Sequence, residues 1–600
     1  MIISEDQTAS LRRVARGWFA ALCALLPLTV WSQSAPPSII DYSARQHPAV
    51  DTRGMVAVQN AIAAEVGAAV LAEGGNAVDA AVAVGLALAV TLPRAGNIGG
   101  GGFMMVYDAE LGTTVAIDYR ERAPAAASRD MFLDDDGDAD DKEARYSYRS
   151  VGVPGTVAGM HYALTEYGTL SWEDVLAPAI ELARDGIRVS NDLSTALSRR
   201  RESLGAHPET LRVFYKPDGS SYRPGEILRQ PDLAWSLQQL SDLGPDAMYR
   251  GEIGQRIVDD MRDNGGLITM QDFADYEVAI REPVRGSYRD FEIVSMPPPS
   301  SGGVLLIQML NVLEQHDIGA LGFGSAKTIH LMTEAMRTAY ADRSLHLGDP
   351  DYHTADIDWL MSKAYARKIS GDIDIRRARD SSDVAPGVNQ GYESPDTTHY
   401  GVMDASGNAV VNTYTLNFSY GSGITAPGTG ILLNNEMDDF SAKPGSPNGY
   451  GLIGGEANAI APGKRPLSSM TPTLILKDGE PVLITGSPGG SRIITTVLQV
   501  IVNVVDHQMS VLDAVAAPRF HHQWLPDRLF LEPGFSPDTI QLLQSMGHNI
   551  SDRSWTMGSA QSISVDGPFQ RGAADPRRPD ALAIGPTDLD CRTSATPCSF

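Results

Sequence analysis

A threonine stands at the boundary between two kinds of sequence. Residues 372–396 are charged, poor in large apolar side chains and without periodicity, which indicates an exposed, flexible segment. Residues 398–403 have the composition of a strand, and Thr397 lies between the two. A threonine hydroxyl is a poor nucleophile unless a base is held beside it. An N-terminal threonine carries one, since its α-amine, with a pKa of about 7.7–8.0, is partly neutral near pH 7.

That amine exists only after the bond between Asp396 and Thr397 is broken, because an uncut chain has an amide nitrogen at this point. One cleavage would therefore convert an inactive precursor into an enzyme. The local pattern does not decide the matter alone, since β-branched residues such as Thr397 and Thr398 also favour strands.

A glycine-rich segment, residues 486–491, joins an expected strand to the apolar helical stretch 493–505. Glycines let backbone N–H groups approach a ligand closely, and N–H groups before a helix favour negative charge. Gly489 and Gly490 are therefore candidates for an oxyanion hole, in which each fixed donor lowers a barrier by roughly 3 kcal/mol. A tight strand-to-helix turn would explain the same glycines.

The elements around these residues predict sheets covered by helices. Residues 398–403, a turn at 404–407 and a return strand at 409–416 form a hairpin. Helices are expected in two parts of residues 56–92, divided at Gly74-Gly75-Asn76, and through most of residues 152–347, with a break at 296–303. Other expected strands are residues 103–107, 115–119, 473–476 and 481–485. The mixture predicts an α+β fold or a layered αββα arrangement.

Composition excludes several classes of partner. The chain has 600 residues and a formal net charge of −26. An acidic surface argues against nucleic acid and against docking on anionic lipid, because both need clustered basic residues. The run 80–92 is apolar but too short to cross a bilayer, and we expect it to be a buried helix.

The N-terminus has the order of a secretory signal peptide. Arg12, Arg13 and Arg16 precede an apolar stretch at 18–31, and small residues follow around Ser34. We expect residues 1–34 to be removed and the protein to be periplasmic, without a stable membrane anchor. Cys591 and Cys598 could pair in an oxidising compartment, and the tail that holds them has no functional interpretation.

Longer motifs give these residues a context. Residues 397–400 and 412–417 begin a series that continues through 432–440, 465–473 and 486–492. In this order the motifs resemble the small subunit of the γ-glutamyltranspeptidases, which are N-terminal nucleophile hydrolases. Residues 118–121 and 296–303 resemble the family's large subunit, so the similarity covers about residues 57–577.

The resemblance implies a four-layer αββα sandwich built from one self-cleaved precursor, with a large subunit at 35–396 and a small subunit at 397–600. It implies that Thr397 attacks a γ-glutamyl amide such as glutathione, and that water, an amino acid or a dipeptide accepts the glutamyl group. No cofactor or metal is implied. Thr415 matches a threonine that hydrogen-bonds the nucleophile, while His399 is expected to be structural.

The same resemblance assigns the binding residues. Arg120, Ser468 and Ser469 match groups that hold the substrate α-carboxylate, and a guanidinium suits a carboxylate through paired hydrogen bonds. Tyr450, in a lid loop at 443–455, would shield the site from water. The groups that match acceptors of the α-ammonium are Asn417, Glu436 and Asp439. Taken singly, each of these residues also fits an ordinary strand, turn or loop position.

Two other functions compete with this interpretation. A cephalosporin (glutaryl) acylase of the same fold would use the same threonine, but a glutaryl group lacks the amine that Asn417, Glu436 and Asp439 would receive. A non-enzymatic periplasmic binding protein would use the glycines at 99–102 or 486–491 to cradle phosphate. Neither loop has the Lys and Ser or Thr of a P-loop.

Overall fold

The structure, a computed structural model, describes residues 47–384 and 397–593. The expected signal segment 1–34, the position of Asp396 and the position of Cys598 lie outside these residues. Cys591 is described and is disulfide-bonded. Within the described ranges, no helix has both the length and the apolar character needed to cross a bilayer.

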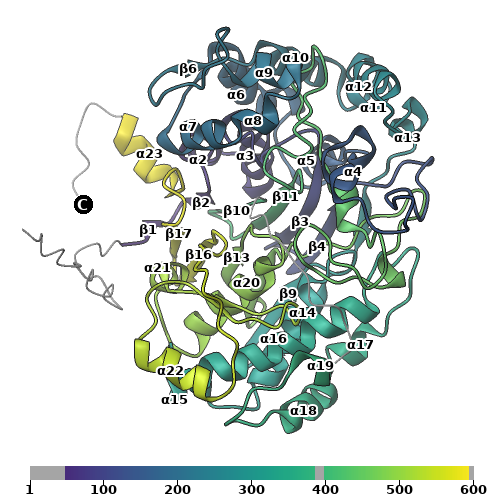
Figure 1. Cartoon of the computed structure of the whole chain (residues 1–600). Helices are drawn as coiled ribbons and strands as arrows, with labels where there is room; N and C mark the ends of the chain where they lie inside the picture. Colours follow the sequence, from purple (N-terminus) through teal and green to yellow (C-terminus); the bar gives the residue numbers. More distant parts are fainter. Residues whose placement is uncertain (1–46, 385–396, 594–600) are drawn as a thin grey trace, which may run out of the picture. The chain divides into compact units, whose positions relative to one another are not determined.

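The first sheet is antiparallel and joins chain segments from both sides of Thr397 (Figure 1). Strands β10 and β11 follow Thr397 and are inserted between β2 and β3, which precede it. The strand order is β18 (Leu582–Ile584), β2 (Gly54–Val58), β10 (Thr398–Asp404), β11 (Ala409–Thr415), β3 (Gly101–Asp108), β4 (Thr113–Tyr119) and β7 (Ala279–Arg281). A cut before Thr397 therefore leaves both products within one hydrogen-bonded sheet.

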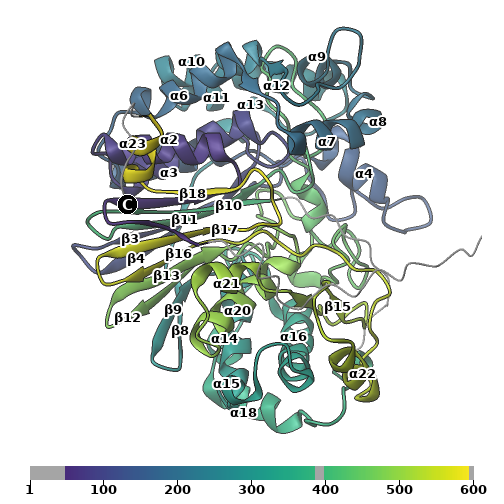
Figure 2. The ribbon, with the colours of Figure 1, turned by 90° about the vertical axis from the view of Figure 1, so that its left-hand side faces the viewer.

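The second sheet is also antiparallel and mixes the same two parts of the chain. Its order is β1 (Ala49–Asp51), β17 (Phe569–Ala574), β16 (Gln561–Asp566), β13 (Glu480–Gly486), β12 (Thr473–Lys477), β9 (Phe291–Ser295) and β8 (Val284–Tyr288). The two sheets stack face to face (Figure 2). Between them lies a buried apolar layer that includes Phe103, Met105, Val411, Ile484 and Ile563.

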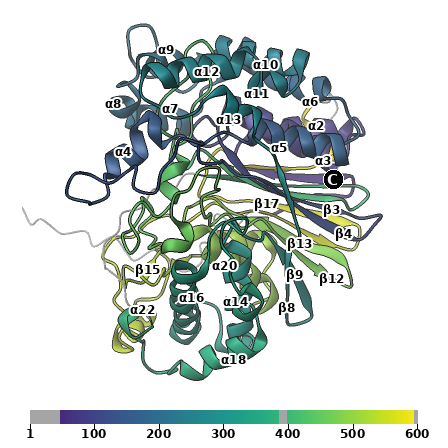
Figure 3. The ribbon, with the colours of Figure 1, turned by 90° about the vertical axis from the view of Figure 1, so that its right-hand side faces the viewer.

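Helices cover the outer face of each sheet, which gives the layer order helix, sheet, sheet, helix (Figure 3). Those associated with the first sheet are α2 (Ala61–Ala72), α3 (Ala77–Thr91), α5 (Thr156–Tyr167), α6 (Trp172–Asp185), α10 (Pro231–Leu243) and α12 (Glu252–Asp263). Those associated with the second sheet are α14 (Gly302–Leu313), α16 (Ala326–His346), α18 (Lys363–Asp372), α20 (Arg492–Val505), α21 (Val511–Ala516) and α22 (Pro537–Ser545). The predicted αββα arrangement is confirmed.

Most predicted elements near Thr397 are present, including the hairpin of β10 and β11 and the buried helix α3. One prediction was wrong, since residues 56–58 form the end of β2 rather than the start of a helix. Residues 152–347 are mostly helical, as predicted, and also contain the short strands β5 (Ile187–Arg188), β6 (Ile227–Leu228), β7, β8 and β9.

The segment that ends at Val384 is mostly exposed, as predicted, but it is anchored at one buried residue. Ser381, in α19 (Ser381–Val384), is buried, and its hydroxyl donates to the carbonyl of Trp524 at 2.6 Å. Its N–H donates to Asp527 at 2.8 Å, and Trp524 returns an indole hydrogen bond of 2.9 Å. The predicted flexibility stays a prediction, and residues 385–396 lie outside the described part.

Candidate active site

The hairpin places Thr397 opposite Thr415. Thr398 pairs with Tyr414 in the antiparallel register, so the next residues outward, Thr397 and Thr415, face each other at the open end. Their hydroxyl oxygens are 3.3 Å apart, and Thr397 is only 5% exposed. The N–H of Asn417 donates to the Thr415 hydroxyl at 2.8 Å. This leaves the Thr415 hydroxyl able to donate to Thr397.

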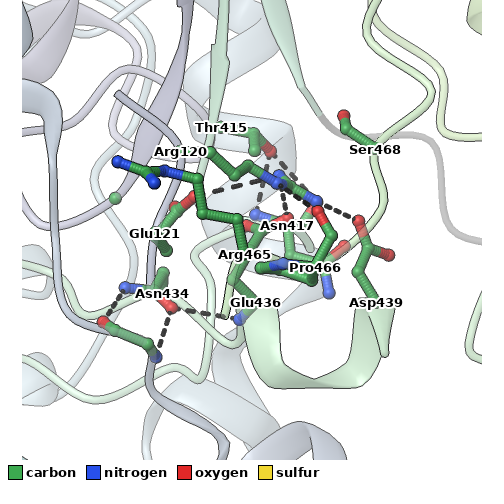
Figure 4. A network of polar contacts seen from close by, with 12 residues as sticks. Arg120, Glu121, Thr415, Asn417, Asn434, Glu436, Asp439, Arg465, Pro466 and Ser468 are labelled. Atoms are coloured by element: carbon green, nitrogen blue, oxygen red, sulfur yellow. Dashed lines mark hydrogen bonds and ion pairs between the residues drawn. The ribbon is translucent and has the colours of Figure 1, made fainter. Parts of the chain in front are cut away.

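Arg120 forms the charged centre of the neighbouring pocket (Figure 4). It follows β4 directly, is fully buried, and its guanidinium donates to Glu436 and to Asp439. Its Nε donates to the carbonyl of Pro466 at 3.3 Å. Burial alone would lower the pKa of Arg120, but the two carboxylates outweigh it and raise that pKa above its ordinary value. Arg120 is therefore a permanent cation.

The carboxyl groups around Arg120 outnumber it. Glu121 is fully buried, and its oxygen lies 3.8 Å from the Arg120 guanidinium. Burial raises the pKa of Glu121 to about 7, although Arg120 opposes the change. Burial also raises the pKa of Glu436, again against the attraction of Arg120 and reinforced by Glu121. The pocket thus gathers three acidic side chains whose negative charge is costly without a further cation.

Two polar atoms that belong to lining residues have no hydrogen-bond partner in the structure, namely Oε2 of Glu436 and the hydroxyl of Ser469. The same holds for both carboxyl oxygens of Glu121, which lies beside Arg120 but does not line the pocket. Buried polar groups are nearly always paired in native proteins, so the two lining atoms are candidates to contact a ligand. The hydroxyl of Ser468 accepts from the N–H of Met470 at 3.1 Å. The amide of Asn417 donates to the carbonyl of Asn435 at 2.9 Å.

The glycine pair lies beneath the lid loop. Gly489 and Gly490 have φ values of +131° and +56°, and they precede α20 closely. A Cβ on Gly490 would lie 2.4 Å from the ring of Tyr450, so only glycine fits there without displacing the tyrosine. The Tyr450 hydroxyl donates to the carbonyl of Asn417 at 2.7 Å. The expected mobile surface loop is, in this structure, closed over the site, with Tyr450 buried.

One pocket unites the residues that the sequence predicted. Every one of them except Gly489 lines it, and the members are Arg120, Thr397, Thr415, Asn417, Glu436, Asp439, Tyr450, Ser468, Ser469 and Gly490. Arg343 lines it as well, although no motif in the sequence pointed to this residue. The cavity measures about 20 Å³, which is room for little more than one water molecule.

Asn434 explains why the binding loop has its shape. Its side-chain oxygen accepts from the N–H groups of Gly152 and Glu436, and its NH₂ donates to the carbonyls of Gly99 and Gly152. A Cβ on Gly99 would lie 2.2 Å from the carbonyl oxygen of Leu432. The glycine run at 99–102 therefore allows close packing of the backbone under the site. This packing explains the glycines without the phosphate binding that the binding-protein alternative required.

One buried group outside this pocket has the spacing of metal ligands, namely His330, Glu334 and His548. The two imidazoles are joined by a hydrogen bond of 2.8 Å, and both oxygens of Glu334 contact arginines, Arg337 and Arg379. Both oxygens of Glu334 and both ring nitrogens of His330 are thus hydrogen-bonded, whereas Nδ1 of His548 has no partner, and none of the three residues lines the pocket of Thr397.

The candidate nucleophile directly precedes a central strand of an αββα sandwich, and cleavage before it would make its amine the base. This arrangement defines the class of N-terminal nucleophile amidohydrolases and acyltransferases. Comparison of the chain with known protein families and structures narrows this class. The family model described as gamma-glutamyltranspeptidase matches residues 63–585. The chain therefore belongs to the γ-glutamyltranspeptidase family.

Individual relatives agree with this assignment. The chain is 51% identical to the glutathione hydrolase proenzyme of Escherichia coli strain K12, over 96% of this chain and 99% of the relative. A cephalosporin acylase structure from Bacillus halodurans matches with a TM-score of 0.80 at 26% identity, covering 92% of this chain and 99% of that one. The Helicobacter pylori gamma-glutamyltranspeptidase structure matches with a TM-score of 0.53 at 46% identity, covering 56% and 95%.

Proposed function

We propose that the precursor cuts itself between Asp396 and Thr397 and becomes a γ-glutamyltransferase with glutathione hydrolase activity. The observation that carries the proposal is that Thr397 shares one small pocket with the guanidinium of Arg120, two serines and two carboxyl groups, those of Glu436 and Asp439. A γ-glutamyl donor brings an α-carboxylate, an α-ammonium and a γ-carbonyl. This pocket offers a partner to each of them.

Binding of the donor replaces ion pairs within the pocket by ion pairs with the donor. Without a ligand, Arg120 pairs with Glu436 and Asp439. On binding, the α-carboxylate takes hydrogen bonds from Arg120, Ser468 and Ser469, while the α-ammonium donates to Asn417, Glu436 and Asp439. Each buried charge keeps an opposite partner throughout, so the desolvation cost of binding is offset. A glutaryl group would leave the acidic side chains without their cation, which disfavours the acylase alternative.

Catalysis then proceeds in two acyl transfers. The α-amine of Thr397 accepts the hydroxyl proton while Oγ1 bonds to the γ-carbonyl carbon, and the N–H groups of Gly489 and Gly490 hold the oxyanion. The proton passes to the departing amine, which leaves a γ-glutamyl ester on Thr397. Water releases glutamate from this ester, or the amine of an amino acid or dipeptide accepts the glutamyl group. Thr415 orients the hydroxyl in both steps.

Mass and sequence of the purified protein test the proposed cleavage. We expect two fragments, the smaller beginning at Thr397 and the larger ending at Asp396. They should co-elute under native conditions, because β2 and β3 of the large subunit enclose β10 and β11 of the small one. An active preparation made of uncut chain would contradict the proposal.

Release of residues 1–34 and a periplasmic location complete the proposal, on the order of Arg12, Arg13 and Arg16 before an apolar stretch. The larger fragment of secreted protein should begin near residue 35. A mature fragment that retains Met1 would contradict it.

Closure by Tyr450 gives a further prediction. Since the cavity under the lid is too small for a dipeptide, the lid must open for the donor and close again over it. Tyr450→Phe removes the hydroxyl that bonds to the Asn417 carbonyl. Loss of one buried hydrogen bond should lower kcat/KM for γ-glutamyl p-nitroanilide by ~2- to 10-fold. Tyr352→Phe, which removes an exposed hydroxyl bonded to the carbonyl of Pro462, is the matched control and should change nothing.

A further inference from the structure

Arg343 is a buried arginine with an unusual set of partners. It lies in the last turn of α16, is 4% exposed, and lines the pocket of Thr397 as well as the adjoining hollow beside Asp438 and Lys443. Its Nε donates to the hydroxyl of Ser301 at 3.0 Å, and its Nη2 lies 3.5 Å from the carbonyl of Leu467. No carboxylate of residues 47–384 or 397–593 forms an ion pair with it within 4.0 Å.

Other buried arginines of the described chain show what is missing. Five of the six others have a carboxylate within 4.0 Å, and they are Arg94, Arg120, Arg337, Arg465 and Arg519. The sixth is Arg492, whose guanidinium lies over the ring of Trp555, 4.8 Å from its centroid. A buried cation without an anion is costly, because neutral hydrogen-bond acceptors replace water only in part. The C-terminal end of a helix offsets some of this cost. An anion that arrives with the substrate would supply the rest.

The bonds of Arg343 lead to the carboxylate side of the pocket. The hydroxyl of Ser301 donates to the carbonyl of Ser468 at 2.7 Å, and the N–H of Ser301 donates to the same carbonyl at 2.9 Å. Ser301 belongs to the block at 296–303, for which the catalytic mechanism has no direct use. Ser301 thus holds the backbone of Ser468 in place, and Arg343 is hydrogen-bonded both to Ser301 and to the residue before Ser468.

We propose that Arg343 is a second guanidinium of the carboxylate subsite, which contacts the α-carboxylate of the donor together with Arg120, Ser468 and Ser469. The inference rests on the proposed γ-glutamyl chemistry and adds a specificity-determining residue to it. Nothing in the motifs at 118–121 or 465–473 assigns this role.

Charge balance favours a second cation here. Arg120 is already shared between Glu436 and Asp439, and Glu121 is close by. An anion that contacted Arg120 alone would enter a pocket of net negative charge. Burial lowers the pKa of Arg343 to about 10, with Asp439 opposing, so the side chain is still a cation at neutral pH. Arg343 therefore adds a second positive charge to the pocket and weakens the repulsion that its acidic neighbours exert on an incoming anion.

The test compares two donors on two variants of the mature enzyme. Arg343→Gln keeps an NH₂ donor but removes the charge. Arg343→Lys keeps the charge but loses the paired N–H groups of the guanidinium. The donors are γ-glutamyl p-nitroanilide and 4-aminobutyryl p-nitroanilide, which differ only in the α-carboxylate. Arg343→Gln should raise KM for the first by about tenfold with kcat nearly unchanged, and Arg343→Lys by less, because the lost interaction acts in binding. Neither should change kcat/KM for the second donor.

Several outcomes would overturn the inference. They are an equal change on both donors, or no change on either with Arg343→Gln. If that variant fails to fold or to cut itself, Arg343→Lys decides between the same outcomes, since it too should raise KM for the carboxylate donor alone. Wild-type enzyme that does not turn over γ-glutamyl p-nitroanilide would instead refute the proposed function.

Discussion

Replacement of Thr397 by alanine should leave a single uncut polypeptide without measurable transfer or hydrolysis. The variant loses the hydroxyl that attacks both the scissile peptide bond and the donor, and without cleavage no α-amine forms beside it. Loss of a covalent nucleophile removes at least ~10⁴-fold of the rate in comparable enzymes. Electrophoresis reports the cleavage, and release of p-nitroaniline from γ-glutamyl p-nitroanilide reports the activity. Far-ultraviolet circular dichroism should be unchanged, because Thr397 precedes β10 and donates no ladder bond.

Two variants separate the chemistry from the fold. Thr398→Val is the matched control, since Thr398 is buried beside Thr397 and its hydroxyl has no partner in the structure. We expect it to cut itself and to retain activity. Thr397→Ser keeps a hydroxyl on an N-terminal amine and should still cut and turn over, more slowly. Activity in uncut Thr397→Ala, or equal losses in Thr397→Ala and Thr398→Val, would show that another group is the nucleophile.

The catalytic hairpin was predictable because its signals are local. A composition change before Thr397, a four-residue turn and alternation of strand residues all lie within about twenty positions. The register then follows from the turn, and it places Thr415 opposite Thr397 without further information. Arg120, Glu436 and Ser468 could be chosen only by resemblance to a family, because nothing in the sequence states that three distant segments meet.

Arg343 and Ser381 mark the limit of such reasoning. Arg343 lies on a helix whose sequence contains no recognisable motif. Its interest emerges only from the three-dimensional structure, in which no described carboxylate forms an ion pair with it. The segment around Ser381 looks exposed in sequence because it is charged. Ser381 is nonetheless buried because Arg337, Asp527 and Trp524, all remote in the chain, provide its partners. In both cases long-range contacts override local composition.

The strands β7, β8 and β9, within the mostly helical region 152–347, could not be identified from the sequence for a related reason. Val284–Tyr288 contains Arg285, Gly286 and Ser287 between its apolar ends, so its pattern resembles a turn more than a strand. Its ladder with β9 and the packing of Ile307 against Gly286 stabilise it nonetheless. Edge strands of a large sheet depend on neighbours that a window of sequence does not contain.

Replacement of Arg120 by methionine should have the second largest effect, a ~10³-fold loss of kcat/KM for γ-glutamyl p-nitroanilide, since removal of one partner from a buried charged hydrogen bond costs about 2–5 kcal/mol. Arg120 is the one residue that contacts both halves of the ammonium pocket, Glu436 and Asp439, before the donor arrives. Without it the α-carboxylate loses its fork, and the clustered carboxyl groups take up protons and attract the ammonium less. The measurement is the rate with this donor and with 4-aminobutyryl p-nitroanilide, in enzyme shown to be cut.

Arg145→Met is the matched control for Arg120. Arg145 pairs with Asp438, the neighbour of Asp439, and is mostly buried, so the change removes one cation from the same acidic loop. It lies outside the pocket of Thr397, and we expect a small and equal effect on both donors. Arg120→Met should instead strongly reduce the preference for the donor with an α-carboxylate, of which Ser468, Ser469 and Arg343 keep a part. If Arg120→Met and Arg145→Met reduced both donors alike, Arg120 would stabilise the loop rather than bind the carboxylate, and the charge exchange proposed for the pocket would be wrong.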